Sequence, residues 1–214
     1  MIGMAGVDGP EWRISEEAGE AVVLALYLRQ VLGLRSPDDL PYLRGIPPRP
    51  EQHPGHELEH PSDEDARALL ERQWREFWAM TVEPQAHPSS VPLDLVEGFG
   101  TMIALPAEGA DELRAAIAPH AAEARAYARS VHDRHAKAHT NPATSYRGYA
   151  SAIAGFERQV GRRAHSFELN VQVLPLQQRG VWWIGSLTVA VTDGLRGDVA
   201  AFDAAIHPII AELA

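Results

Sequence analysis

The sequence predicts an α+β fold in which a predominantly helical N-terminal two-thirds packs on a small antiparallel sheet. The sheet is built around a C-terminal β-hairpin and is closed by a C-terminal helix. Helical periodicity up to about residue 160 is followed by two strand-like runs and one more helical stretch, and early helices with late strands are typical of this class. The 214 residues are 45% hydrophobic, so we expect a single domain over residues 1–214.

The first predicted helix runs from Ser15 to about Leu32, after a loose, glycine-rich segment at 1–14. Ser15 can cap this helix, acidic residues follow it, and Gly33 can end the helix. Residues 21–28 are apolar all round, so we expect the helix to be buried inside the fold or against a second copy.

A proline-rich connection is predicted at 36–61. Connections of this length are uncommon inside compact domains and are often mobile or functional. A helix then follows from Ser62 to Pro84, and its apolar residues Leu70, Trp74, Phe77 and Trp78 share one face. Such an aromatic stripe packs in a core or forms a docking face for a ligand or partner.

The middle of the chain predicts a loop at 85–97, a strand at 99–105 and helical residues from Asp111 to about His139. Pro119 interrupts this helical stretch, either as a kink or as the first turn of a second helix. A further helix is expected at 145–160.

Strands are predicted at 167–173 and 181–192, where apolar and polar residues alternate. A short link joins them, so we expect an antiparallel hairpin. Trp182 and Ile184 lie on its nominally polar face, which indicates cover from a helix or a second subunit. Asp198 can cap the last helix, at 199–213, which Pro208 should bend.

Composition excludes several function classes. The absence of cysteine excludes disulfides, thiolate catalysis and cysteine-bound metals. The net charge of −10 disfavours binding to nucleic acid or to an anionic membrane. The sequence shows neither a signal peptide nor an apolar run of the ~20 residues that cross a bilayer. We therefore expect a cytoplasmic protein.

Residues 56–60 read H-E-x-x-H, in which His56 and His60 would hold zinc and Glu57 would activate water. This chemistry needs a continuous helix, because only then do both imidazoles face one metal. Pro54 precedes the string and Pro61 follows it directly, which disfavours that helix. We interpret the string as part of an acidic linker, with catalysis by Glu57 as the alternative.

A second metal hypothesis uses His132, His135 and His139, which share a face at i, i+3 and i+7 of a predicted helix. We expect no cofactor, with zinc or another divalent metal as the alternative. Sequence signatures of serine nucleophiles and of nucleotide-binding loops are absent.

The leading prediction is a non-catalytic domain that acts through protein contacts, as a homo-oligomer or with a protein partner. The first alternative is a metal-dependent hydrolase. A third possibility is a small-ligand-binding protein. The residues predicted for a ligand or partner surface are Trp74, Trp78, Tyr146, Trp182 and Trp183.

Overall fold

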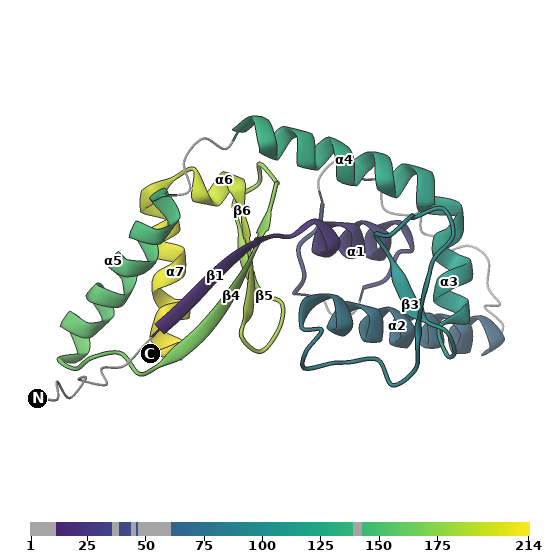
Figure 1. The fold of residues 1–214 in the computed structure, drawn as a ribbon, viewed down its shortest axis with the longest axis horizontal. Coiled ribbons are helices and arrows are strands. Elements are labelled where there is room, and N and C mark those ends of the chain that lie inside the picture. The colour runs from purple at the N-terminus through teal and green to yellow at the C-terminus, as the bar shows by residue number, and fades with distance from the viewer. Residues whose placement is uncertain (1–11, 36–38, 44–45, 47–60, 139–142) are drawn as a thin grey trace, which may run out of the picture.

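The computed structural model describes residues 12–35, 39–43, 46, 61–138 and 143–214, leaving aside the side chains of residues 61–63, 134–138 and 143–146. Helices and strands both build the fold, so the predicted α+β class is confirmed (Figure 1). The helices are α1 (Glu20–Val31), α2 (Pro61–Val82), α3 (Asp111–Ile117), the 3-10 turn η1 (Ala118–His120), α4 (Ala121–Ala138), α5 (Ala143–Val160), α6 (Asp193–Arg196) and α7 (Val199–Leu213). The strands are β1 (Trp12–Ala18), β2 (Leu93–Leu95), β3 (Ala104–Pro106), β4 (Phe167–Leu174), β5 (Val181–Trp183) and β6 (Thr188–Thr192).

The larger sheet is mixed, with strand order β1-β4-β6-β5. Strands β1, β4 and β6 run parallel, and β5 pairs antiparallel with β6. The predicted antiparallel sheet is therefore wrong. Alternation of apolar and polar residues determines which face a strand buries, but it does not determine the direction of the neighbouring strand.

The C-terminal hairpin lies within the second predicted run rather than between the two runs. The N–H groups of Ile184 and Gly185 donate to the Thr188 carbonyl at 2.9 and 3.1 Å, which folds the segment into a turn between β5 and β6. Strand β4 then pairs with β6 on the side that β5 leaves open. The single strand predicted at 181–192 is thus two strands.

The N-terminal prediction is also wrong, because residues 12–18 form strand β1 and the helix begins only at Glu20. Trp12 and Ile14 face the apolar cluster under the sheet, and the alternate residues face outward. The Ser15 hydroxyl donates to the Asn170 side chain at 2.7 Å instead of capping a helix. Two consecutive acids after Ser15 resemble a helix start, and this local signal is overridden by parallel pairing with β4.

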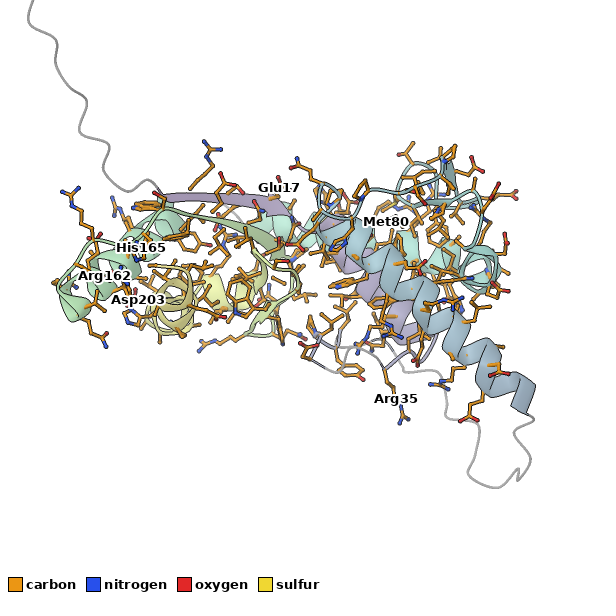
Figure 2. The ribbon with its side chains drawn as sticks, turned by 90° about the horizontal axis from the view of Figure 1, so that it is seen from below. Glu17, Arg35, Met80, Arg162, His165 and Asp203 are labelled. Carbon is orange, nitrogen blue, oxygen red and sulfur yellow. The ribbon has the colours of Figure 1, made fainter. Side chains whose placement is uncertain are left out.

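Two apolar clusters build the interior. The first lies among α1, α2, α3 and α4, and the second lies between the sheet and the helices α5 and α7. Figure 2 shows α5 and α7 on one side of the sheet and α2 in the other half of the molecule. Strands β4 and β6 serve both clusters, since Val173 belongs to the second, whereas Leu174 and Ala190 belong to the first.

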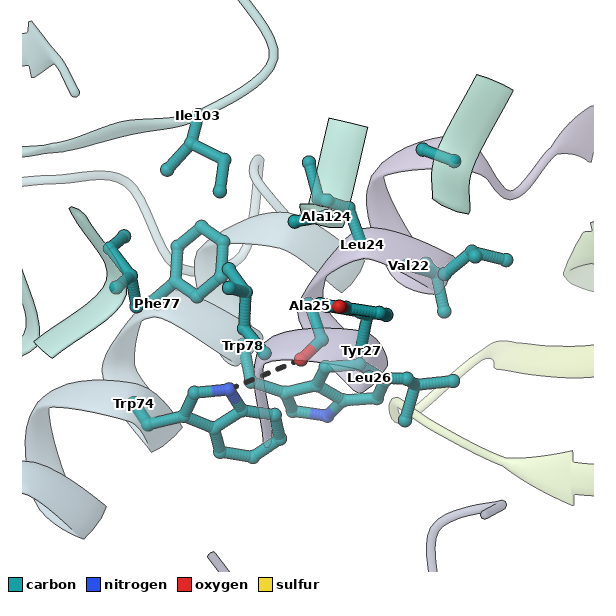
Figure 3. Packing of buried hydrophobic residues seen from close by; sticks show 14 of the residues in the cluster. Val22, Leu24, Ala25, Leu26, Tyr27, Trp74, Phe77, Trp78, Ile103 and Ala124 are labelled. Atoms are coloured by element: carbon teal, nitrogen blue, oxygen red, sulfur yellow. Dashed lines mark hydrogen bonds between the residues drawn. The ribbon is translucent and has the colours of Figure 1, made fainter. Parts of the chain in front are cut away.

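Helix α1 is buried along most of its length, as the sequence predicts. Its neighbours in the chain's own fold are α2, α4 and strand β4. The indole N–H of Trp74 donates to the carbonyl of Ala25 at 3.3 Å and ties α2 to α1 (Figure 3). The apolar surface that favoured a second copy is therefore covered within one chain.

Several other predicted elements are confirmed. Helix α2 starts one residue before the predicted cap, at Pro61, where a missing N–H costs no helical hydrogen bond. Pro119 lies in the 3-10 turn that joins α3 to α4. Helix α7 begins after Asp198, whose carboxylate accepts the N–H of Ala201 at 3.1 Å, and it contains Pro208.

Part of the proline-rich connection packs on α1. Leu40, Leu43 and Ile46 are buried in the first apolar cluster. The amide of Gln30 donates to the carbonyls of Leu43 and Ile46 at 3.0 and 2.7 Å, and its oxygen accepts the N–H of Leu43 at 2.9 Å.

Among the described helices, none has an apolar stretch long enough to traverse a bilayer.

Candidate functional site

The clearest exposed apolar feature is the two-stranded ribbon of β2 and β3, called here the β2–β3 ribbon. All three residues of β2 are exposed, and its side chains Leu93 and Leu95 are 51% and 59% accessible. Because alternate residues of a strand face the same side, both leucines lie on one face, opposite Pro106 and Ala104 of β3. Among the described strands, β2 is the one that carries two exposed large apolar side chains.

The ribbon is held in place by its other face. Leu105 is fully buried in the first apolar cluster, together with Val96 and Ile103 on either side of the ribbon's turn. Arg114 of α3 donates to the carbonyls of Leu105 and Pro106 at 3.4 and 2.9 Å. The two leucines are therefore presented on a supported element rather than on a free loop.

Among the described residues, no strand pairs with the outer edge of β2. The N–H of Val96 donates to the carbonyl of Ile103 at 3.0 Å, and the N–H of Ala107 donates to the carbonyl of Pro92 at 2.9 Å. Since the residues that bond to the partner strand alternate along an antiparallel strand, the N–H and C=O groups of Leu93 and Leu95 point away from β3. In the described part of the chain, this sheet consists of two strands.

Most of the predicted metal ligands lie outside the described part of the chain. His56, Glu57, His60 and His139 lie outside the described residues, and helix α2 begins at Pro61, directly after the H-E-x-x-H string. His132 lies on α4 with an exposed side chain, and the side chain of His135 is outside the described part. Within the described residues, no group of three or more histidine, aspartate or glutamate side chains could hold a metal ion.

The predicted aromatic surface is divided between the two clusters. Trp74 and Trp78 are buried and stacked, with ring centroids 5.4 Å apart. Trp182 packs against the first cluster and Trp183 against the second, both half-buried, while the side chain of Tyr146 is not described. Ile184 is buried in the first cluster too, so the face of β5 that Trp182 and Ile184 share is covered from within the chain.

A small pocket lies where the parallel strands β1 and β4 end, beside α4. It is lined mostly by apolar side chains, with Glu20 and His132 as its ionisable groups; the lining residues are Ala18, Gly19, Glu20, Val23, Ala128, Val131, His132, Val173 and Pro175. Ligands of parallel sheets bind at this end of the strands. Two ionisable groups at an apolar opening give little orientation to a substrate.

A charged network lies at the same end of the sheet. The Tyr149 hydroxyl donates to the Glu16 carboxylate at 2.8 Å, and Arg196 donates to its other oxygen at 2.8 Å. Arg196 also lies 3.5 Å from a carboxylate oxygen of Asp193. Burial, the charge of Glu16 and the hydrogen bond to it raise the pKa of Tyr149, which stays a donor at neutral pH. The network joins α5, β1 and α6.

Glu83 directly follows α2, and its carboxylate connects the helices of the first apolar cluster to the β5–β6 turn. Its carboxylate accepts the N–H of Leu187 at 3.2 Å and the hydroxyls of Ser186 and Thr188 at 3.3 and 3.4 Å. Burial alone would raise the pKa of Glu83, but these hydrogen bonds outweigh it and lower the pKa. This contact holds the two halves together and leaves little of the carboxylate for catalysis.

Comparison with models of protein families, with curated proteins and with solved structures gives no significant match. The functional assignment therefore depends on the geometry described above. Sequence reasoning missed Leu93 and Leu95, since residues 85–97 were predicted to form a loop. The signal that could have found them is Leu93-Asp94-Leu95, three residues of strand alternation between turn-forming prolines and glycines.

Proposed function

We propose that this chain is a non-catalytic protein-interaction domain and that the β2–β3 ribbon is its contact surface. The observation that carries the proposal is the pair Leu93 and Leu95, both more than half exposed on a strand whose outer edge pairs with no other strand among the described residues. An exposed apolar strand edge invites pairing with another chain, and natural proteins usually cover or charge such edges.

The surfaces that the chain covers itself favour a different protein over a second copy as the partner. Helix α1 and the Trp182 face of β5 favoured self-association in the sequence, and both are covered by the chain's own residues. They no longer argue for a second copy. The open ribbon is available to a different protein, and Asp94 at the centre of β2 disfavours pairing with the same strand of a second copy, because like charges would lie opposite each other.

The test is site-specific crosslinking in cells of the natural host. Leu95 is replaced by the photo-reactive residue p-benzoylphenylalanine, and the matched control carries it at Leu187, which is 42% exposed on the β5–β6 turn. We expect one reproducible adduct with an identified protein from position 95 and none from position 187. No adduct, or the same adducts from both positions, would contradict the proposal.

Light scattering of the purified chain separates the two kinds of partner. We expect a mass near 23.4 kDa, the mass of one chain, at micromolar concentration. A dimer that Leu93→Ser and Leu95→Ser together dissociate would instead make the ribbon a self-association surface.

A further inference from the structure

We infer that the β2 edge binds an extended, basic segment of its partner as an added strand. This inference rests on the proposed function and specifies the partner that the ribbon would take. Addition of a strand to an open sheet edge is a recurrent mode of peptide recognition, in which main-chain hydrogen bonds give affinity and alternate side chains give specificity.

The backbone of β2 is oriented for the addition of a strand. Leu93 and Leu95 direct their N–H and C=O groups to the open side, so a strand laid along β2 can form hydrogen bonds with both residues. Their side chains lie on one face of the ribbon, so they would contact every second side chain of the added strand. Aliphatic residues at those positions would cover the two exposed leucines.

The charges around the β2–β3 ribbon favour a basic partner. Residues 88–113 contain five acids and no lysine, arginine or histidine. All five acids are exposed; they are Asp94, Glu97, Glu108, Asp111 and Glu112. Two arginines approach from neighbouring helices, and both use their guanidinium groups on backbone carbonyls, Arg114 on Leu105 and Pro106, Arg125 on Gly98. The excess of acid favours a strand with lysine or arginine between its aliphatic residues.

Two longer segments outside the described residues, 1–11 and 47–60, do not have this composition. Residues 1–11 contain two acids and no base, and residues 47–60 are rich in proline and contain one arginine against three glutamates. A second copy of β2 would bring the same acids to the interface. The chemistry of the edge therefore points to a different protein that has a basic, extended segment.

The probe is a fluorescein-labelled peptide of eight residues in which lysine and valine alternate. The matched controls are the same peptide with glutamate in place of lysine, and the lysine peptide methylated on alternate backbone nitrogens, which removes one hydrogen-bonding edge. We expect the lysine peptide to bind at least about tenfold more tightly than either control. Raising the salt concentration should weaken its binding.

Changes in the amide chemical shifts of the wild-type protein on addition of peptide locate the binding site without a variant. We expect the largest changes at Leu93 and Leu95 with the lysine peptide, and largest changes elsewhere would overturn the inference. Equal binding of the lysine and glutamate peptides, or equal binding of the methylated peptide, would overturn it as well.

A variant pair gives the reciprocal check. Asp94→Lys reverses one charge on the ribbon, and Glu76→Lys makes the same change on the exposed face of α2. Asp94→Lys should weaken binding of the lysine peptide severalfold and strengthen binding of the glutamate peptide. Glu76→Lys should change the affinity for neither peptide. A partner that crosslinks at Leu95 through an acidic or helical segment would overturn this inference alone, whereas absence of any crosslink there would overturn the proposed function.

Discussion

At the scale of single residues, Glu83 has the most concentrated set of contacts. One carboxylate with 14% of its side chain exposed accepts three hydrogen bonds from the turn between β5 and β6. Gly185 lies directly against the Glu83 side chain, and a Cβ added at Gly185 would come within 2.5 Å of the Glu83 carboxyl carbon. The close fit between the turn and Glu83 therefore depends on glycine at position 185. The fit makes Glu83 a structural residue whose ionisation affects stability.

We predict that Glu83→Gln destabilises the protein by about 1–2 kcal/mol at pH 7, because a neutral amide is a weaker acceptor than a carboxylate. The folded-state pKa of Glu83 is lowered, so its contribution is complete above the ordinary glutamate value of 4.5 and is lost as pH falls through the folded value. The difference in unfolding free energy between wild type and variant should therefore shrink on acidification.

Urea denaturation at pH 7 and below pH 4 measures this difference. Glu76→Gln is the control, since Glu76 is exposed on α2, the helix that precedes Glu83. Equal destabilisation by the two variants, or a Glu83→Gln effect that grows in acid, would refute the assignment.

At the scale of elements, the start of α6 is fixed by a close backbone approach. The N–H of Gly194 donates to the carbonyl of Leu176 at 2.9 Å, and a Cβ on Gly194 would collide with the carbonyl of Gln177. The segment that follows β4 thus lies directly against the residues that follow β6.

Two glycine substitutions should act in opposite directions. Gly194→Ala is expected to cost about 2–4 kcal/mol, because the clash is with backbone that cannot move aside. Gly155→Ala in α5 is expected to stabilise by about 0.5–1 kcal/mol, since the new Cβ finds its nearest neighbour at 3.5 Å and alanine favours helix. Thermal unfolding of both variants beside wild type provides the measurement. Shifts of the same sign would show that the backbone approach is not limiting.

The elements also show how far sequence reasoning extends. Helices α2, α4, α5 and α7 were predictable because periodicity, caps and prolines are local signals. Strand β1 was not, because its evidence is the pairing of Trp12 with Phe167, which no local window contains. The same holds for strand direction in the sheet and for the exposure of Leu93 and Leu95, which depends on the burial of Leu105 from the opposite strand.

At the scale of the whole molecule, two apolar clusters share one sheet. Val173 and Leu174 at the end of β4 point into different clusters, and so do Val189 and Ala190 of β6. Loss of either cluster should therefore affect the strands that the other cluster uses. Glu83 adds a polar connection between the halves. We therefore expect the described helical and sheet parts to unfold together.

Leu174→Ala tests this expectation. Leu174 is fully buried and belongs to the first cluster, so its truncation should cost about 3–5 kcal/mol. Hydrogen exchange should then accelerate in α5 of the second cluster as much as in α2 of the first. Leu187→Ala, at an exposed position, is the control and should cost less than about 0.5 kcal/mol. Faster exchange in α2 with α5 unchanged would show two independent units.

The pairing of β1 with β4 also has a consequence for biosynthesis. Strand β1 leaves the ribosome before β4 has been translated. Its pairing partner follows about 150 residues later, so β1 cannot join the sheet until then. Helices such as α2 and α4 can form in the meantime from local contacts. Closure of the sheet therefore follows translation of most of the chain, and until then the nascent β1 strand exposes an unpaired backbone to which a chaperone could bind.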